Sequence, residues 1–521
     1  MTPLPLSDFR DLPALVAQHA AQRPQAAALC MGDQSLNYAQ LHAGADRHAL
    51  DLQQAGLGPG DCVALCTQTQ VEAVLLFLGA LRAGLAVAPL APGSTPAQLA
   101  AMAGDCQARR IYIDDSVAAQ HVSWPTGVPV LLMQGAELAS ASASASPPAK
   151  PVAVPIDPSW PFNIIYSSGT TGTPKGIVQA HAMRWAHIQR ASLSGYGPDT
   201  VTLIATPIYS NTTLVCLIPT LAHGGCVVLC PPRFDALTYL RLAQQHRATH
   251  TMLVPVQYQR LMDHPDFNTF DLSSFRYKFC TSAPFLAPLK ADVLARWTGA
   301  LVEYYGLTEG GGTCVLQAHL HPHKLHTVGQ PAEGHDIRLI DEAGTEIKRR
   351  PGGASESEGE VAGRSPGMMT GYHGRPDLTA QAEWFDDQGR RYIRTGDIAR
   401  FDDDGFLVLM DRRKDMLISG GFNVYPSDLE AVLRGHPAVA DVAVVGVPSR
   451  AWGETPVGFA VLVPGQAITA ADLLAWANQR LGKTQRMFAL RLLPELPRSV
   501  IGKVLKRELR ERAARLEAAA D

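Results

Sequence analysis

Short apolar segments that end in Ser, Thr, Pro or Gly recur through the first 330 residues, and they alternate with segments of helical spacing. Examples are residues 162–168 (FNIIYSS), 200–207 (TVTLIATP) and 249–255 (THTMLVP). Strands that alternate with helices predict an α/β fold built on parallel, doubly wound sheets. Because ligands of such sheets bind beyond the carboxyl ends of the strands, we expect a functional site where these segments end.

The pattern changes after about residue 336 and again near residue 414. Residues 391–413 (RYIRTGDIARFDDDGFLVLMDRR) have the pattern of short strands joined by Asp/Gly turns, which predicts a small β-barrel-like segment. A compact α+β pattern follows Lys414. We therefore predict a large N-terminal domain, residues 1–413, and a small C-terminal domain, residues 414–521. The Ala/Ser/Pro-rich stretch at residues 139–150 predicts an exposed, flexible loop.

Charge and composition limit the classes of partner. The 521 residues carry a net charge of −3, with 46% apolar and 18% charged residues, as in an ordinary globular enzyme. This balance gives no electrostatic footprint for nucleic acid or an anionic membrane. No uncharged apolar run reaches the roughly 18 residues of a membrane span, and the N-terminus lacks the pattern of a signal peptide. Nine cysteines without framework spacing indicate reduced thiols, so we expect a cytoplasmic protein.

The segment from Tyr166 to Gly176 (YSSGTTGTPKG) follows directly after an apolar strand. Glycines allow the backbone to approach an oligophosphate and to point N–H groups at it. The hydroxyls add donors, and the lysine adds a mobile cation. A Walker A loop is excluded, because Gly176 stands where that motif needs Ser or Thr after the lysine. The residues predicted to bind phosphate are Ser167, Ser168, Gly169, Thr170, Thr171, Gly172 and Lys175.

Further motifs follow this loop in order. They are TSAP at 281–284, YYGLTEGGG at 304–312, TGD at 395–397, DRRKD at 411–415, ISGGFNVYPSDLE at 418–430 and PRSVIGKVLKREL at 497–509. With the loop they resemble the signature of the adenylate-forming superfamily, which contains acyl-CoA synthetases, adenylation domains of peptide synthetases and beetle luciferases. The resemblance covers about residues 10–515. Asp411 is a minor departure, because the family usually has Gly there.

The resemblance implies where ATP binds. It assigns Tyr305 to stacking on adenine, Thr308 to the α-phosphate and Glu309 to Mg²⁺. A carboxylate suits this metal, whose charge offsets that of the phosphates. Asp397 would accept hydrogen bonds from the ribose hydroxyls, with Arg412 as a second ribose contact. The other residues implied to line the nucleotide site are Ser282, Ala283, Pro284, Tyr304 and Gly306.

The resemblance also implies a two-step reaction. The substrate carboxylate attacks the α-phosphate of ATP and releases pyrophosphate, and coenzyme A then attacks the acyl-adenylate and releases AMP. Lys503 would act as the catalytic lysine that holds the carboxylate and the α-phosphate together in the first step. The small, mobile domain would then rotate about the hinge Lys414 and bring the loop of Ser419, Gly420 and Gly421 to the thiol arm.

Alternatives to coenzyme A ligation remain. In the first alternative, the acceptor of the acyl group is a carrier protein or another group such as oxygen. In the second, the chain is an inactive nucleotide-binding regulatory homologue. An inactive homologue is disfavoured by the presence of Lys175, Glu309, Asp397 and Lys503. An α-amino acid substrate is disfavoured, because no Asp lies between Pro207 and Thr213 to hold an amino group. The expected partners are therefore a small carboxylic acid, ATP and coenzyme A, and a homodimer is compatible with the sequence.

The acyl pocket is assigned from the same resemblance. The segment PIYSNTT at 207–213 matches the family region that often carries a His gate between the two half-reactions. Ser210 stands where His is common, which makes Tyr209 the candidate gate. Glycines after Glu309 would leave the pocket wide, so we expect an aryl or medium-chain acid. The pocket residues are Tyr209, Ser210, Thr212, Gly310 and Gly311.

The histidine-rich segment at residues 319–326 (HLHPHKLH) raises the alternative of a metal site. It has no acidic or Cys partner at a fixed spacing. We therefore predict a polar surface loop there.

Overall fold

The structure is a computed structural model of the chain. It describes residues 8–133, 149–167, 175–350, 353–355, 357–412, 415–419, 422–449, 453–482, 485–499 and 503–517. Contacts divide the chain into a first unit, Met1–Asp336 with Gly363–Ile393, and a second unit, Ile337–Ala362 with Arg394–Asp521. This division assigns much of the β-rich segment to the second unit, and the sequence boundary at Lys414 stays a prediction.

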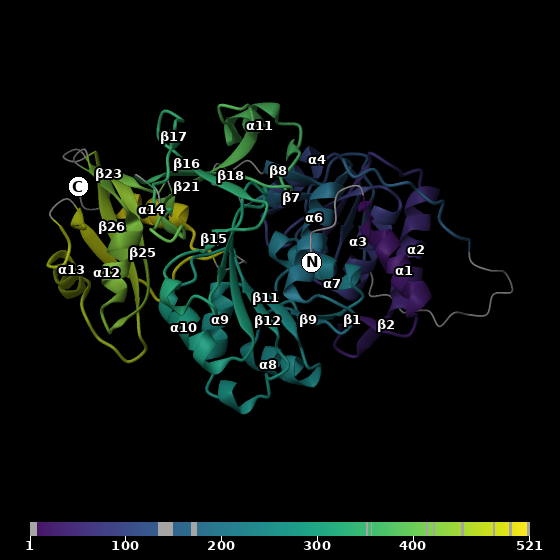
Figure 1. The fold of residues 1–521 in the computed structure, drawn as a ribbon, viewed down its shortest axis with the longest axis horizontal. Coiled ribbons are helices and arrows are strands. Elements are labelled where there is room, and N and C mark those ends of the chain that lie inside the picture. Colours follow the sequence, from purple (N-terminus) through teal and green to yellow (C-terminus); the bar gives the residue numbers. More distant parts are fainter. Residues whose placement is uncertain are drawn as a thin grey trace. The chain divides into compact units, whose positions relative to one another are not determined.

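The first unit contains a large sheet with a parallel centre. Within the described residues this sheet has nine strands, and antiparallel pairing occurs only at its two ends. Figure 1 shows its central strands beside one another. The order is β15 (Gln330–Pro331), β14 (Cys314–Gln317), β13 (Ala300–Tyr305), β12 (Tyr277–Cys280), β11 (His250–Leu253), β9 (Val201–Ile204), β10 (Cys226–Leu229), β1 (Ala27–Met31) and β2 (Gln34–Asn37).

A second sheet of the same unit has seven strands in the described chain. Its order is β19 (Gly371–Tyr372), β8 (Lys175–Ala180), β7 (Pro161–Ser167), β4 (Ala86–Pro89), β3 (Cys62–Cys66), β5 (Ala108–Ile113) and β6 (Val130–Leu132). All five residues of β3 are buried, as expected for a central parallel strand that is covered on both faces. Antiparallel pairing occurs where β8 pairs with β7 and with β19, and the other strand pairs of this sheet in the described chain are parallel.

Helices between these two sheets share one hydrophobic core with both of them. They are α1 (Leu12–Gln22), α2 (Tyr38–Gln54), α3 (Val71–Arg82), α6 (His181–Ala191) and α7 (Asn211–Ala222). In α3 every residue is buried except Glu72 and Arg82, and burial on all sides is expected of a helix enclosed between layers. Gly79 allows α2 to approach closely, because a Cβ atom there would lie 2.7 Å from the carbonyl oxygen of Ala45.

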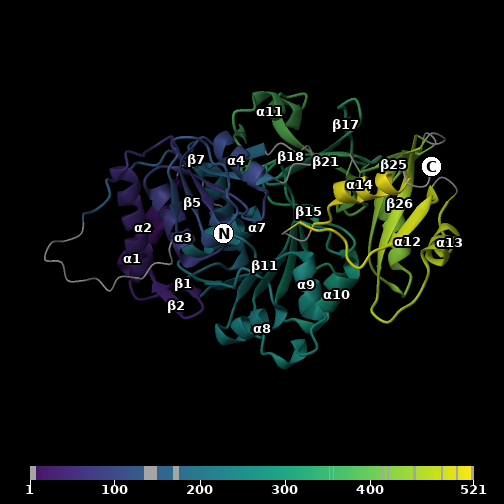
Figure 2. The same cartoon turned by 180° about the vertical axis from the view of Figure 1, so that it is seen from behind.

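Other helices cover the outer faces of the two sheets. Helix α4 (Pro96–Asp105) and α5 (Asp115–Ala118) pack on the seven-stranded sheet through a second core, and Figure 2 shows α4 beside β5 and β7. Helices α8 (Ala236–Gln245), α9 (Pro255–Met262) and α10 (Ala287–Arg296) gather on the nine-stranded sheet. Aromatic side chains fill this outer layer, where Trp297 contacts Tyr239 and Tyr258.

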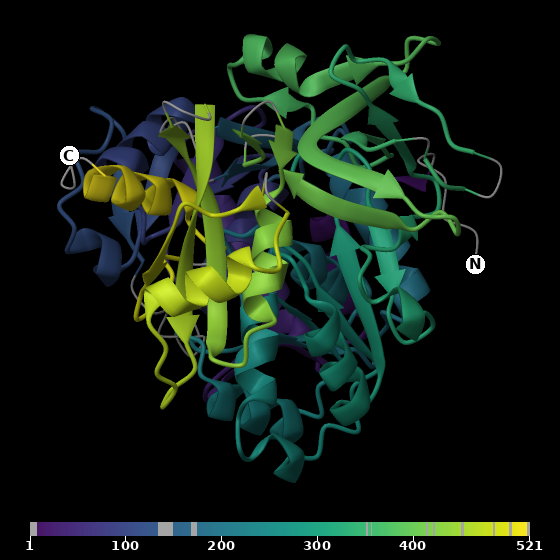
Figure 3. The ribbon, with the colours of Figure 1, turned by 90° about the vertical axis from the view of Figure 1, so that its left-hand side faces the viewer.

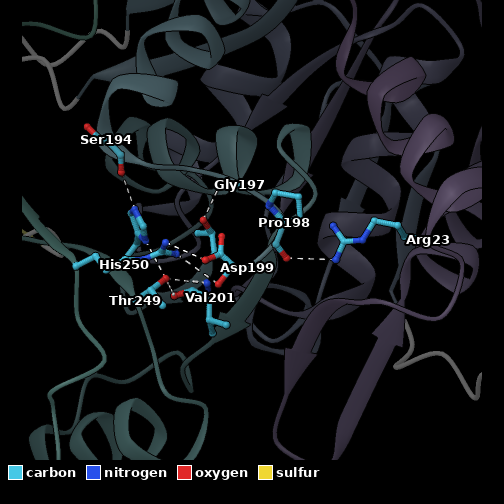
Figure 4. Close-up of polar contacts among 10 residues, drawn as sticks. Arg23, Ser194, Gly197, Pro198, Asp199, Val201, Thr249 and His250 are labelled. Carbon is cyan, nitrogen blue, oxygen red and sulfur yellow. Dashed lines mark hydrogen bonds and ion pairs between the residues drawn. The ribbon is translucent and has the colours of Figure 1, made fainter. Parts of the chain in front are cut away.

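A buried histidine ties β11 to the connection that precedes β9 (Figure 4). His250 Nε2 lies 2.9 Å from the carbonyl oxygen of Ser194, and Nδ1 lies 2.8 Å from Thr249 Oγ1. A carbonyl oxygen only accepts, so Nε2 carries the proton of the neutral ring. The Thr249 hydroxyl also accepts the backbone N–H of Val201 at 2.9 Å. Burial lowers the pKa of His250 to about 4.

The β-rich segment predicted after residue 336 is present. In the second unit its strands are β16 (Asp336–Ile340), β17 (Glu346–Ile347), β18 (Gly359–Arg364), β21 (Arg391–Phe401) and β22 (Leu407–Arg412). Its neighbours in sequence, α11 (Pro376–Ala382) and β20 (Glu383–Phe385), fall in the first unit, where β20 pairs with the first residues of β21. The strands form a sheet of six in the described chain.

The C-terminal part of the second unit is a sheet covered on both faces (Figure 3). The sheet consists of β24 (Phe422–Val424), β23 (Leu417–Ser419), β26 (Gly453–Leu462), β25 (Val439–Ser449) and β27 (Ala489–Leu492). Alternate residues of β25 face opposite sides, as the period of a strand requires. Val442 and Val444 join the core under α12 (Pro426–Arg434) and α13 (Ala470–Asn478), whereas Val445 joins the core under α14 (Lys506–Glu517).

The fold class predicted from the sequence is confirmed: a large α/β part precedes a small α+β part, and all the strand segments quoted above form strands. The low-complexity stretch at 139–150 lies almost wholly outside the described residues. Among those described, no helix has the length and apolar character needed to cross a membrane.

Candidate active site

The predicted phosphate loop connects two antiparallel strands. Ser167 at the end of β7 pairs in register with Lys175 at the start of β8. Five predicted residues, Ser168, Gly169, Thr170, Thr171 and Gly172, lie outside the described residues. A Walker A loop leads from a strand into a helix, whereas this loop leads from a strand into a strand. The strand-to-strand connection therefore agrees with the conclusion from the sequence that this is not a Walker A loop.

Lys175, Tyr372 and Glu309 come together at the start of β8. The Lys175 ammonium lies 5.5 Å from the centre of the Tyr372 ring, a distance at which a cation is attracted to an aromatic face. The Tyr372 hydroxyl donates a hydrogen bond of 2.8 Å to Glu309 Oε1. Burial, and then the Glu309 carboxylate, raises the pKa of Tyr372, so the phenol keeps its proton.

Strand pairing brings Tyr372 to this place. Tyr372 lies opposite Ile177 in the pairing of β19 with β8, and the next residue, His373, donates its backbone N–H to the carbonyl oxygen of Gly176 at 2.7 Å. The backbone of Glu309 is held from the same segment, because Met369 N–H donates to its carbonyl oxygen at 2.8 Å. Sequence reasoning missed Tyr372, because only long-range pairing sets it beside Glu309.

The turn that follows Glu309 is packed closely. Gly310 has a positive φ of +86°, and a Cβ atom there would lie 1.8 Å from the carbonyl oxygen of Gly367. A Cβ atom on Gly311 would lie 3.1 Å from the carbonyl oxygen of Gly363. The expectation that these glycines leave a wide pocket was therefore wrong: the space beside Gly310 is filled by backbone. Glycine is needed there for conformation and close packing.

Thr308 is anchored through its backbone. Its carbonyl oxygen accepts a hydrogen bond of 2.7 Å from Gln179 Nε2, and Gln179 is fully buried on β8. The strand that carries Lys175 therefore also fixes the backbone of Thr308. The sequence placed Thr308 and Lys175 in one site, and in the structure both belong to this part of the first unit.

The TSAP segment follows β12 and is bound to neighbouring elements. Thr281 Oγ1 donates to the carbonyl oxygen of Tyr304 at 2.9 Å. Ser282 has a φ of +82°, which is uncommon for a residue other than glycine and indicates a conformation held by its surroundings. Its hydroxyl lies 2.7 Å from Thr212 Oγ1 at the start of α7. Ala283 and Pro284 are half-buried and exposed, respectively.

The segment predicted to carry the gate leads into α7. Ser210 is the N-cap residue of this helix, and its Oγ accepts the backbone N–H of Thr212 at 3.3 Å. Tyr209 is half-buried, and burial raises its pKa to about 12. Ser210 therefore has a capping role that its sequence position did not reveal. Tyr209 stays the candidate gate.

Tyr304 and Tyr305 are successive residues of β13, so their side chains point to opposite faces of the sheet. Tyr304 is half-buried against Phe279, with ring centroids 5.7 Å apart. Tyr305 retains 9% of its surface. Gly306, which follows, is exposed. The two side chains therefore lie on different faces of the sheet, although the sequence assigned both residues to the nucleotide site.

In the second unit, the TGD turn is held by an ion pair. Arg394 Nη2 lies 2.5 Å from Glu360 Oε2, and Glu360 Oε1 accepts the backbone N–H of Gly396 at 3.2 Å. Gly396 has a φ of +71°, which explains glycine at this position. Asp397 is 7% exposed and lies directly opposite Arg412 in the pairing of β21 with β22. The two predicted ribose contacts are therefore neighbours in one sheet.

Lys503 lies shortly before the start of α14. Its carbonyl oxygen accepts the N–H of Ser499 at 2.8 Å, and its own N–H donates to Ser499 Oγ at 3.2 Å. The residue is exposed. Ser419 ends β23, opposite Phe422. The predicted residues Lys414, Gly420 and Gly421 lie outside the described residues.

Two other features do not belong to this site. A cavity of about 630 Å³ in the first unit contains none of the predicted residues, and its lining includes His48, Glu72, Arg110 and Leu132. Nowhere in the described ranges do three His, Cys, Asp or Glu side chains form a group that could hold a metal ion. That finding includes the histidine-rich segment, where His319 Nδ1 lies 3.2 Å from the carbonyl oxygen of Leu301.

Comparisons with known proteins agree with this arrangement. The family model of the AMP-binding enzyme matches residues 16–373, and that of the AMP-binding enzyme C-terminal domain matches residues 428–503. Feruloyl-CoA synthase of Amycolatopsis sp is 34% identical over 505 residues, which cover 95% of this chain and 97% of that protein. The fatty acid–acyl-carrier-protein ligase ScoC of Streptomyces coeruleorubidus is 31% identical over 507 residues, covering 95% of this chain and 94% of ScoC.

Among solved structures, ATP-bound MatB from Rhodopseudomonas palustris superposes with a TM-score of 0.84 and 30% sequence identity. The match covers 96% of this chain and 99% of that chain. Family model, relatives and fold all extend over both units. The chain therefore belongs to the family of AMP-binding enzymes.

Proposed function

We propose that this enzyme is an ATP-dependent carboxylic acid–CoA ligase, which forms an acyl-adenylate with release of pyrophosphate and then an acyl-CoA thioester with release of AMP. The observation that carries the proposal is the group Lys175, Tyr372 and Glu309 at the end of the glycine- and hydroxyl-rich loop. A cation and an oriented carboxylate beside a phosphate loop suit the transfer of an adenylyl group.

Lys175 supplies positive charge to the phosphates of ATP. Thr308, which follows the end of β13, contacts the α-phosphate. Glu309 is the carboxylate that would hold Mg²⁺, which when bound offsets phosphate charge. The fit is chemical, because carboxylate oxygen is a preferred ligand of this metal. Tyr372 occupies one oxygen, Oε1, and thereby orients the other.

In the second unit, Asp397 and Arg412 bind the ribose. The two residues lie opposite each other on adjacent strands, and Asp397 is held in place by the turn that Glu360 and Arg394 stabilise. Lys503 neutralises the carboxylate and the α-phosphate as they approach, since two anions otherwise repel each other. The loop from Ser419 to Gly421 receives coenzyme A in the second step, and Lys414 is the hinge between the two steps.

The acid is an aryl or medium-chain acid, and the similarity to feruloyl-CoA synthase favours the aryl class. Tyr209, half-buried at the start of α7, is the candidate wall and gate of the acyl pocket. Thr212, three residues after Tyr209, shares a hydrogen bond with Ser282.

The test measures pyrophosphate and thioester separately. The enzyme is incubated with ATP, Mg²⁺ and a panel of aryl and medium-chain acids, with and without coenzyme A. Pyrophosphate with every productive acid, and acyl-CoA only when coenzyme A is present, is expected. Absence of pyrophosphate with the whole panel would overturn adenylation, and pyrophosphate without any thioester would overturn coenzyme A as the acceptor.

A second candidate is transfer to a carrier protein, and it is favoured by the similarity to ScoC, whose name specifies an acyl carrier protein. The same assay with a phosphopantetheinylated carrier protein in place of coenzyme A distinguishes the two acceptors. Mass spectrometry of the carrier protein detects the acyl group directly.

A further inference from the structure

Four basic side chains meet behind the segment from Tyr304 to Gly310 in the first unit. Arg184, His187 and Arg190 lie on α6 at spacings of three residues, and neighbours at this spacing share a helix face. His335, just before β16, joins them, because Arg190 and His335 both lower the pKa of His187. We refer to these four residues as the basic cluster.

Arg184 is the most deeply buried arginine of the cluster. It is 1% exposed, and its guanidinium donates to Asn163 Oδ1 at 3.0 and 2.8 Å and to Gln179 Oε1. Both acceptors are neutral amides. Burial lowers the pKa of Arg184 to about 9, so the side chain remains charged at neutral pH. A buried charge with neutral partners only is costly unless an anion is close.

His187 is positioned as a donor. Its Nδ1 lies 3.5 Å from Arg184 Nη1, which only donates, so Nε2 carries the proton of the neutral ring. Nε2 lies on the side of Gly367, 3.5 Å from where a Cβ atom of that glycine would be. Part of the residue's surface is accessible. Burial and the neighbouring cations hold the pKa of His187 well below its ordinary value.

Arg190 and His335 complete the cluster. The guanidinium carbon of Arg190 lies 5.3 Å from the centre of the Tyr304 ring, and the residue is half-buried. His335 Nδ1 accepts the backbone N–H of Thr313 at 3.0 Å, which again leaves the proton on Nε2. Burial, and then Arg190, lowers the pKa of His335 to about 4.

Among the residues that the structure describes, no acidic side chain balances these groups. Within the described part of the chain, none of the four forms an ion pair with Asp or Glu. The charges that shift the pKa of His187 and of His335 are all basic. Other arginines of the unit, such as Arg82 and Arg296, do have carboxylate partners. The basic cluster therefore has positive charge and donors in excess.

The cluster adjoins the proposed reaction site. Gln179 connects Arg184 to the carbonyl oxygen of Thr308, since it accepts from the first and donates to the second. Gly367 separates His187 from Gly310 by one layer of backbone. Arg190 covers Tyr304, four residues before Thr308. The basic cluster therefore lies close to the backbone that carries Thr308.

We propose that His187 and Arg190, supported by Arg184 and His335, bind a second carboxylate at the far end of the acid, so that the enzyme prefers dicarboxylic acids to their neutral-ended analogues. This inference rests on the proposed function. The second carboxylate accepts a hydrogen bond from His187 Nε2 and a charge-assisted hydrogen bond from Arg190. The same anionic oxygens could come from a phosphate of ATP, and the experiment distinguishes the two sources.

The experiment compares acids matched in length: terephthalate with p-toluate, and adipate with hexanoate. For the wild type, kcat/KM of pyrophosphate release is expected to be at least ~10-fold higher for the dicarboxylate of the preferred pair, which corresponds to about 1.4 kcal/mol. In Arg190→Gln this preference is expected to disappear. Arg190→Lys keeps the charge and should retain part of it. The matched control is Arg241→Gln, an exposed arginine of α8, which should leave the preference unchanged.

Three outcomes would overturn the proposal. The first is a preference of the wild type for p-toluate and hexanoate. The second is an equal loss of kcat/KM for both members of a pair in Arg190→Gln. The third is a rise of KM for ATP in place of the loss of preference, which would assign the cluster to phosphate.

A binding measurement separates this proposal from the proposed function. Without ATP, the preferred dicarboxylate should raise the Tm of the wild type but not that of Arg190→Gln or His187→Ala. If no acid yields pyrophosphate, adenylation fails, yet this Tm difference still tests the basic cluster. Equal Tm shifts in wild type and variants would show that the basic cluster does not bind the dicarboxylate, whether or not the enzyme releases pyrophosphate.

Discussion

The hydroxyl of Tyr372 donates a hydrogen bond of 2.8 Å to Oε1 of Glu309, across 63 positions of sequence. The same ring lies 5.5 Å from the ammonium of Lys175. Tyr372 therefore orients the one carboxylate of the site that is proposed to hold Mg²⁺, and it does so from the strand that pairs with the end of the phosphate loop.

Removal of this hydroxyl should weaken the binding of Mg²⁺ at the site. In Tyr372→Phe we expect the Mg²⁺ concentration for half-maximal pyrophosphate release to rise, and the rate to fall by about 10- to 100-fold, as is typical when a group that orients a metal ligand is lost. Tyr239→Phe is the matched control, because it loses a buried hydrogen bond to Thr251 Oγ1 of 2.9 Å elsewhere in the unit. The same Mg²⁺ dependence in both variants would show that Tyr372 has no positioning role.

The two half-reactions should respond differently to the loss of Lys503. Lys503→Ala is expected to reduce pyrophosphate formation by about 100-fold or more, since it removes the charge that offsets two approaching anions. Formation of acyl-CoA from supplied acyl-adenylate should be largely retained. Lys348→Ala, at an exposed position of the same unit, is the control. Equal loss of both half-reactions would contradict the assigned role.

Gly310 should tolerate no side chain, for two separable reasons. Gly310→Ala combines a φ of +86° with a contact of 1.8 Å to the carbonyl oxygen of Gly367, whereas Gly127→Ala has a φ of +80° and open space. We expect the Gly127 variant to lose about 1–2 kcal/mol from backbone strain alone. The Gly310 variant should lose a further ~1–3 kcal/mol from overpacking. Thermal unfolding of both variants measures the difference, and equal Tm values would contradict the close contact.

Stability of the first unit should fall in mild acid because of His250. Its folded-state pKa is lowered to about 4, chiefly by burial, from an ordinary value of 6.5. The unfolded chain therefore binds the proton more readily, so this contribution is complete above pH 6.5 and is lost as the pH falls towards 4. The shift of the pKa corresponds to a full contribution of about 3 kcal/mol to the free energy of unfolding.

The pH prediction is checked by urea unfolding of the wild type and of His250→Phe between neutral pH and mild acid. The variant loses the hydrogen bond to Ser194 at every pH, so it should be less stable at neutral pH. Its stability should nevertheless depend less steeply on pH. Parallel pH profiles of the two proteins would show that His250 does not titrate with unfolding.

Much of the fold was predictable because its determinants are local. Strand segments such as 162–168 and 249–255 have a run of apolar residues that sets their type, and both formed as predicted. The family could be recognised for the same reason, because each motif is a contiguous stretch that combines glycines, hydroxyls and one or two charges. The loop up to Lys175, the turn at Glu309 and the TGD turn at Asp397 each carry their chemistry within a few residues.

Other features depend on contacts between segments far apart in the chain, and no local pattern encodes them. The pairing of β19 with β8 brings Tyr372 to Glu309, and the packing of Gly367 against Gly310 removes the space that the glycines seemed to provide. The sequence by itself thus determined the α/β architecture, the family and the order of the motifs. Only the tertiary structure decided which side chains meet at Glu309. It also decided that Arg190 joins a cluster that has no acidic partner among the described residues, because burial and strand register act across the whole unit.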